Sequence, residues 1–225
     1  MSKFALVVGL ATALLVGTSA FAVDGQVLIN QSTVMAAGGF PYRITQPGSY
    51  KLSGNLVVPA DTDGIDVYAS NVTVDLNGFT ISHPIICSGS GPSLSCPFTG
   101  VASGINSLGY GTTVRNGSVT GFSYYGIVLL GRGNLVEDVH GAFNESGIGV
   151  YAGVVRRSTS SDSYTGISAT KSTVTENVLI ANRDAGLRIS GGLFGSNTLA
   201  DNGRDIVGGA PSISQNNNSC NGNTC

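Results

Sequence analysis

The densest group of side chains that could do acid–base chemistry is the segment Val136-Glu137-Asp138-Val139-His140. It contains two carboxylates and one of the 2 histidines of the chain, and these residue types often act as general acids and bases. Asp138 and His140 are therefore the candidate catalytic residues. Structural ion-pair networks produce the same composition, and Asp138 also falls at a repeat position, described below, that favours a structural role.

Charged residues recur at equivalent places in successive repeats and alternate in sign: Arg115, Glu137, Arg156 and Glu176. Opposite charges on neighbouring strands favour the correct register by about 0.2 to 1 kcal/mol per pair. We therefore expect an ion-pair ladder, which accounts for Glu137 without a catalytic role.

A second acidic group lies in Asp61-Thr62-Asp63-Gly64-Ile65-Asp66. Its spacing is faintly similar to that of a calcium-binding loop, but the bidentate Glu that closes such a loop is missing. The composition favours a turn rich in Asp and Gly instead. Calcium is therefore not supported, and the sequence predicts no metal site and no cofactor.

Tyrosines form a third group. Tyr68 and Tyr151 occupy equivalent repeat positions, and others cluster in or near turns, namely Tyr110, Tyr124, Tyr125 and Tyr164. They could form an aromatic face that stacks on sugar rings, or they could simply cover the surface of the fold. The sequence leaves both interpretations open.

The elements that position these residues come from an internal repeat of about twenty residues. A small residue followed by an aliphatic one opens each short stretch of alternating apolar residues, which is the period of a β-strand. These pairs are Gly64-Ile65, Gly104-Ile105, Gly126-Ile127, Gly147-Ile148, Gly166-Ile167, Gly186-Leu187 and Asp205-Ile206, with steps of 40, 22, 21, 19, 20 and 19 residues. We interpret the double step as one degenerate repeat around Pro84-Ile85.

A second column keeps the same period further along each repeat. It consists mainly of Asn, which tolerates left-handed backbone angles and can bond to its equivalent in the next repeat. The members of this predicted corner ladder are Asn77, Asn116, Asp138, Arg157, Asn177, Asn197 and Asn216, and a second corner is predicted at Asn144, Asn182 and Asn202. Two columns in one register indicate coils stacked about 4.8 Å apart, a parallel β-solenoid. An antiparallel β-sandwich would also give short strands but would leave the common register unexplained.

Composition excludes several other classes. The chain has 225 residues with 33 Gly and no Trp, and its 13 acidic and 11 basic residues give a net charge of −2. This composition is poor in the residues that long helices need. The charge provides no field that would hold nucleic acid, so no nucleic-acid partner is expected.

The N-terminus has the pattern of a secretory signal peptide over residues 1–22. Lys3 precedes the apolar run Phe4 to Val16, and Ala20-Phe21-Ala22 fits a small-x-small cleavage site. The alternative is a membrane anchor, but the run is shorter than the roughly 20 residues that span a bilayer. We expect a secreted or periplasmic protein with no membrane span after cleavage.

The 4 cysteines form two local pairs, Cys87 with Cys96 and Cys220 with Cys225. In an exported chain, two small disulfide loops are the simplest interpretation. Zinc is the rival, but the spacings are not those of zinc ligands, and His83 is the only histidine near either pair.

The segment from Ile44-Thr45-Gln46-Pro47-Gly48-Ser49-Tyr50 to Asn71-Val72-Thr73-Val74-Asp75-Leu76-Asn77-Gly78-Phe79 resembles the entry and first coil of secreted bacterial parallel β-helix proteins of the pectin-lyase-like superfold. The resemblance extends from Gly39 to Asn216 and implies an all-β, single-stranded, right-handed parallel β-helix, for which the repeat count gives about seven to eight coils. We expect the signal peptide at 1–22, a cap and entry segment at 23–57, the β-helix at 58–216 and a disulfide tail at 217–225.

The resemblance also implies that a substrate groove would lie outside the first strand of each coil. The expected strip is Asp66, Ile86, Asn106, Val128, Gly149, Ser168, Arg188 and Val207. It is largely neutral and lacks the carboxylate clusters that lyases and hydrolases of this group need. Asp66 and Arg188 lie several coils apart, and each is expected to be a solvated surface residue.

Two functional hypotheses follow. The first is a noncatalytic exported protein that binds extracellular polysaccharide or a cell surface, or has a structural role, including assembly through its ends. The alternative is a lyase, epimerase or glycoside hydrolase that acts on acidic polysaccharide, an expectation that rests on fold resemblance alone.

Overall fold

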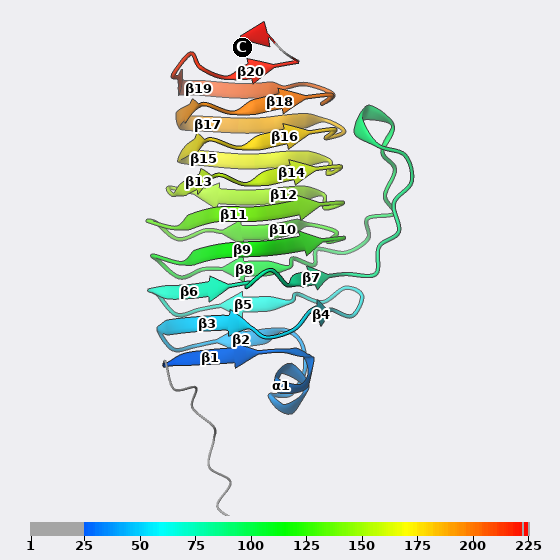
Figure 1. The fold of residues 1–225 in the computed structure, drawn as a ribbon, viewed down its shortest axis with the longest axis vertical. Helices are drawn as coiled ribbons and strands as arrows, with labels where there is room; N and C mark the ends of the chain where they lie inside the picture. Colours follow the sequence, from blue (N-terminus) through cyan, green and yellow to red (C-terminus); the bar gives the residue numbers. More distant parts are fainter. Residues whose placement is uncertain (1–24, 222, 225) are drawn as a thin grey trace, which may run out of the picture.

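The computed structural model describes residues 25–221, 223 and 224, and it shows an all-β parallel solenoid of about nine turns. The strands stack along one axis, with β1 (Gln26–Ile29) and helix α1 (Gln31–Ala36) at one end and β20 (Ser219–Cys220) at the other (Figure 1). The predicted parallel β-helix is confirmed, with slightly more turns than the predicted seven to eight. The predicted signal peptide lies outside the described residues.

Three strips of parallel strands, here called sheets 1, 2 and 3, run along the solenoid, and each coil passes through them in that order. Sheet 1 contains β2 (Tyr42–Ile44), β5 (Ile65–Val67), β8 (Ile105–Ser107), β10 (Tyr125–Leu129), β12 (Ser146–Tyr151) and the first parts of β15 (Thr165–Thr175), β17 (Ala185–Gly195) and β19 (Ile206–Ser214). Sheet 2 contains β1, β3 (Gly48–Leu52), β6 (Val72–Asp75), the first parts of β9 (Thr113–Thr120) and β11 (Leu135–Ala142), β13 (Val154–Arg156) and the second parts of β15, β17 and β19. Sheet 3 contains β4 (Leu56–Val57), β7 (Thr80–Ser82), the second parts of β9 and β11, β14 (Thr159–Ser161), β16 (Val178–Ile180), β18 (Thr198–Ala200) and β20.

The parallel ladder is longer than the predicted solenoid at both ends. Gln26 of β1 pairs with Ser49 of β3, so the ladder begins before residue 58. It continues beyond residue 216, because β20 pairs in parallel with β18, while β21 (Asn223–Thr224) pairs with β20 in the antiparallel sense. Helix α1 lies at the first end and contributes the buried Val34 to the core, so it shields part of the interior there from water.

The interior is a stack of aliphatic side chains from equivalent strand positions. Ile65, Ile105, Ile127 and Ile148 follow one another in the ladder of sheet 1, and all four are fully buried. A short strand cannot bury its apolar side alone, but each coil covers its neighbours. The aliphatic column that was read from the sequence is therefore the core of sheet 1.

The glycine that precedes this aliphatic residue is required by the close approach of successive coils. A Cβ atom at Gly64 would lie 2.5 Å from the carbonyl oxygen of Gly104, and the same contact with the next coil recurs at 2.5 or 2.6 Å for Gly104, Gly126, Gly147 and Gly166. Real Cβ atoms essentially never come that close. Asp205 occupies the equivalent position in the last described coil of sheet 1, where no further described strand lies above it.

The predicted corner ladder divides into two neighbouring columns at the corner between sheets 2 and 3. Asn77, Asn116, Asp138 and Asn216 have positive φ angles of 51°, 70°, 54° and 58°, which Asn and Asp tolerate better than most residues. In the coils between them this position is occupied by Arg157, Glu176 and Ser196.

Asn177 and Asn197 instead lie one residue further on and point into the core. The Nδ2 atom of Asn177 donates to Oδ1 of Asn197 at 3.0 Å, and Asn197 donates in the same way to Asn218. The prediction of a single corner column was therefore wrong. Asn suits both the position with left-handed backbone angles and the buried position that follows it, so the sequence does not distinguish the two. The second predicted corner is confirmed: Asn182 donates to Asn202 at 2.9 Å, and Ser163 links Asn182 to Asn144.

The double step in the repeat is an excursion from the solenoid and not a degenerate coil. Ile65 of β5 pairs directly with Ile105 of β8, and Ile81 of β7 pairs with Val119 of β9. Residues 84–101 leave the stack, contain the short 3-10 helix η1 (Gly91–Ser93) and run along the side of the later coils (Figure 1). Ile86, which the sequence predicted for the outer strip of sheet 1, is instead 86% exposed in this excursion.

Candidate functional site

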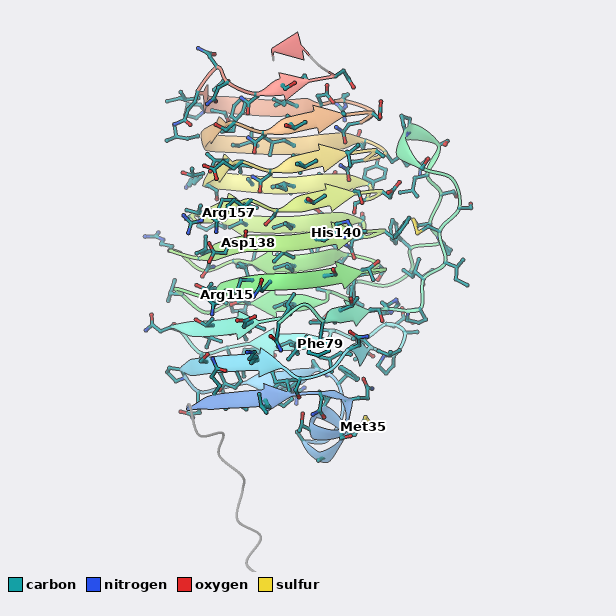
Figure 2. The ribbon with its side chains drawn as sticks, viewed as in Figure 1. Met35, Phe79, Arg115, Asp138, His140 and Arg157 are labelled. Carbon is teal, nitrogen blue, oxygen red and sulfur yellow. A yellow bond between two sulfur atoms is a disulfide. The ribbon has the colours of Figure 1, made fainter. Side chains whose placement is uncertain are left out.

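The structure does not bring the two candidate catalytic residues together. Asp138 is exposed at the corner between sheets 2 and 3, where its carboxylate accepts two hydrogen bonds from Arg157, each 3.0 Å long. His140 lies past the corner on the sheet 3 part of β11, also exposed, with Nε2 3.1 Å from the hydroxyl of Ser161. Figure 2 shows Asp138 beside Arg157 and His140 apart from both.

The electrostatics of Asp138 also fit a structural role. The hydrogen bonds from Arg157 lower the pKa of the Asp138 carboxyl below its usual value. A general acid needs a pKa near the working pH, so this change is in the wrong direction. Asp138 and its neighbour Glu137 are therefore parts of a surface ion-pair network.

The predicted ion-pair ladder is confirmed for three of its four residues, and the fourth residue is a different one. Arg115, Glu137 and Arg156 share one register, and Glu137 lies 2.8 Å from Arg156. Arg156, however, pairs with Thr175, so Glu176 is not in the ladder, and the fourth member is Asp75, 3.2 Å from Arg115. The displacement has the same cause as the split corner, because Glu176 is the residue with positive φ in its coil.

The disulfide between Cys87 and Cys96 is confirmed and closes the tip of the excursion. Cys225 lies outside the described residues, so the pair of Cys220 with Cys225 stays a prediction. In the part of the chain that the structure describes, no group of three or more His, Cys, Asp or Glu residues could hold a metal ion. Nor does any described helix combine the length and apolar character needed to cross a membrane.

The outer side of sheet 1 carries the strip that the sequence predicted, without Ile86. In the ladder the outward residues follow one another as Asp66, Asn106, Val128, Gly149, Ser168, Arg188 and Val207. Arg43 of β2 pairs with Asp66 and adds one member before it. This row forms the floor of the candidate site.

Tyr125 lies across this floor. Its ring covers Gly149, since a Cβ atom on that glycine would lie 2.5 Å from Cε1 of Tyr125. The ring of Tyr124 packs edge-on against it, with the centroids 4.5 Å apart. Gly149 is thus the residue that makes room for an aromatic side chain lying across the sheet.

Two adjoining hollows flank these tyrosines, and together we call them the tyrosine groove. One has a volume of about 370 Å³ and is lined by Asp63, Val101, Ser103, Asn106, Leu108, Tyr124, Tyr125, Val128 and Leu130. The other, of about 200 Å³, is lined by Tyr124, Tyr125, Glu145, Ser146, Tyr164, Thr165, Ser168 and Arg188. Tyr124 and Tyr125 border both hollows, and the groove follows the solenoid axis across successive coils.

A carboxyl pair lies at one end of the groove. Asp66 is not the solvated surface residue that the sequence predicted: it is only 7% exposed, and its Oδ2 atom accepts a hydrogen bond of 3.2 Å from Tyr68. Burial and the neighbouring Asp63 raise the pKa of the Asp66 carboxyl. Asp63 accepts a hydrogen bond of 2.6 Å from the backbone N–H of Ser103. Two neighbouring carboxyls of this kind do not ionise independently.

The sequence analysis grouped these two residues with Asp61 but interpreted the segment as a turn rich in Asp and Gly, so the pairing of Asp63 with Asp66 was missed. The acidic composition of residues 61–66 was visible, but Asp63 lies before β5 and approaches Asp66 from the turn. For Tyr125, the sequence did indicate a cluster of tyrosines. The position of its ring over Gly149 could be seen only in the structure.

The fold and the groove define a parallel β-solenoid protein with an aromatic groove along one sheet. No protein family, curated protein or solved structure matches this chain in sequence or fold comparisons. The resemblance to the pectin-lyase-like superfold therefore stays a prediction.

Proposed function

We propose that this protein is an exported β-helix protein that binds a polysaccharide in the tyrosine groove without cleaving it. The observation that carries the proposal is the ring of Tyr125, which lies across Gly149 in the floor of a groove that Tyr124 and Tyr164 also line. The predicted signal peptide at residues 1–22 supports an extracellular or periplasmic ligand.

The shape and chemistry of the groove suit a carbohydrate chain. Aromatic rings offer apolar surface to the C–H faces of a sugar, while amides and hydroxyls nearby can bond its hydroxyl groups. Asn106 and Ser168 supply such polar groups on the floor. Because the floor residues repeat with each coil about 4.8 Å further along, the groove can take a ligand that is itself a linear repeat.

We expect Tyr125→Ala to weaken polysaccharide binding at least tenfold, because it removes the ring that forms the centre of the groove. The matched control is Tyr110→Ala, since Tyr110 is 61% exposed and lines neither hollow. Isothermal titration calorimetry against soluble glycans measures both affinities. Equal weakening by the two substitutions would contradict the proposal, as would unchanged binding by the Tyr125 variant.

A second candidate function, hydrolysis of the bound polysaccharide, is favoured by the carboxyl pair of Asp63 and Asp66. A carboxyl with a raised pKa can hold a proton that a glycosidic oxygen would accept. The two groups are close enough to interact directly, so they would act as one acid–base unit and not as the separated acid and nucleophile of most glycosidases.

If the protein is a hydrolase, Asp66→Asn should abolish the release of reducing ends from a glycan that the wild-type protein degrades. Asp201→Asn is the control, because Asp201 is an exposed corner residue. Reducing-end assays over several pH values check this. Binding by the wild-type protein with no product after long incubation would exclude the hydrolase and leave the binding function.

A further inference from the structure

The charges along the tyrosine groove limit what kind of polysaccharide it can hold. Among the residues that line the two hollows, the charged ones are Asp63, Glu145 and Arg188. The residues between them on the floor, Asn106, Val128, Gly149 and Ser168, are neutral.

The cation in the groove is already paired. Arg188 forms an ion pair with Asp184, and Arg204 approaches the same carboxylate from the next coil. Recruiting Arg188 to a ligand carboxylate would break this contact. At the other end, Arg43 is the ladder neighbour of Asp66 and faces an acidic pair already in place.

The carboxylates in the groove would oppose an anionic ligand. Glu145 is exposed beside Tyr124 and Tyr125, and it forms no salt bridge among the described residues. A uronate polymer carries one carboxylate per sugar, so several of its charges would lie near Glu145 and Asp63 without a free cation to balance them. Like charges brought together in a partly desolvated site are costly.

We infer that the groove binds an uncharged polysaccharide and discriminates against uronate polymers. This inference rests on the proposed binding function and adds the class of ligand. It also separates this protein from the acidic-polysaccharide enzymes that the sequence suggested as an alternative, because those require groups that neutralise the ligand charge.

The test compares neutral glucans, xylans and mannans with polygalacturonate and alginate of similar chain length, using calorimetry on the full mature chain. We expect at least one neutral glycan to bind at least tenfold more tightly than either uronate polymer. We also expect its affinity to change less than twofold between about 50 and 500 mM salt, because no charge pair is made. Glu145→Gln should raise the affinity for uronate polymers severalfold relative to the affinity of the same variant for the neutral glycan.

The outcomes distinguish the class of ligand from the binding function itself. Uronate binding equal to or tighter than neutral binding, and reduced by Tyr125→Ala, would overturn the ligand class and keep the binding function. Absence of binding to every glycan would overturn both. A Glu145→Gln variant whose uronate affinity stays at the wild-type value would show that repulsion by this carboxylate does not set the preference.

Discussion

Replacing Gly147 with alanine is expected to lower the free energy of unfolding by about 3 kcal/mol, the upper range for overpacking a tight interior. The added Cβ would lie 2.1 Å from Oγ of Ser160 and 2.6 Å from the carbonyl oxygen of Gly166. A smaller residue in place of Ser160 would remove the first of these contacts. The carbonyl oxygen of Gly166 cannot be removed, because it belongs to the backbone of the next coil and its position is fixed by the β-ladder. Thermal unfolding followed by circular dichroism should show a midpoint about 10 °C lower.

The solenoid contains a matched control for this substitution. Gly208 lies in β19 of the last coil, has no positive φ, and its added Cβ would have nothing within 4 Å. Gly208→Ala should therefore leave the midpoint within about 2 °C, because only intrinsic propensity changes. A double variant, Gly147→Ala with Ser160→Gly, should recover only part of the loss. Equal effects of the two alanine substitutions would show that the coils are not packed as closely as described.

Asn197→Ala is expected to destabilise the protein by about 4 kcal/mol, because it leaves several buried polar groups without partners. The side chain of Asn197 accepts hydrogen bonds from the backbone N–H and the Nδ2 of Asn177 and donates to Asn218 and to the carbonyl oxygen of Val174. All of these bonds are buried. Asn197→Leu restores the side-chain volume but not the hydrogen bonds, so this variant should be no more stable than Asn197→Ala.

The control for the buried amide is an exposed one at the same corner. Asn217 accepts a hydrogen bond from the backbone N–H of Ser196 but is exposed to water, so Asn217→Ala should cost about 1 kcal/mol or less. Chemical denaturation of both variants measures the difference. A small effect of Asn197→Ala would mean that water replaces the amide ladder and that the corner is open to solvent.

The parts of the fold that follow from a repeating contact could be predicted from sequence. Each Gly-aliphatic pair satisfies two conditions, since the glycine admits the carbonyl of the next coil and the aliphatic residue fills the core. Both conditions recur from the Gly64 coil to the Gly186 coil, so the column is visible as periodicity, and only the degenerate repeat assumed around Pro84-Ile85 was wrong.

The parts that depend on one local bend could not be predicted in this way. Glu176 and Asn177 differ by one position, and only backbone angles tell which of them turns the corner and which enters the core. The excursion at residues 84–101 has about the length of a repeat but leaves the stack. The pair of Asp63 and Asp66 depends on the turn before β5, and the position of Tyr125 depends on Gly149.

The excursion between β7 and β8 shows where this architecture accepts additional chain. Pairing of β5 with β8 and of β7 with β9 proceeds as though the excursion were not there. The entropy lost in closing such a loop grows only slowly with its length. The excursion that begins after His83 is therefore a place where an epitope, an enzyme or a second binding module could be inserted beside the tyrosine groove while the strand pairings on either side are kept.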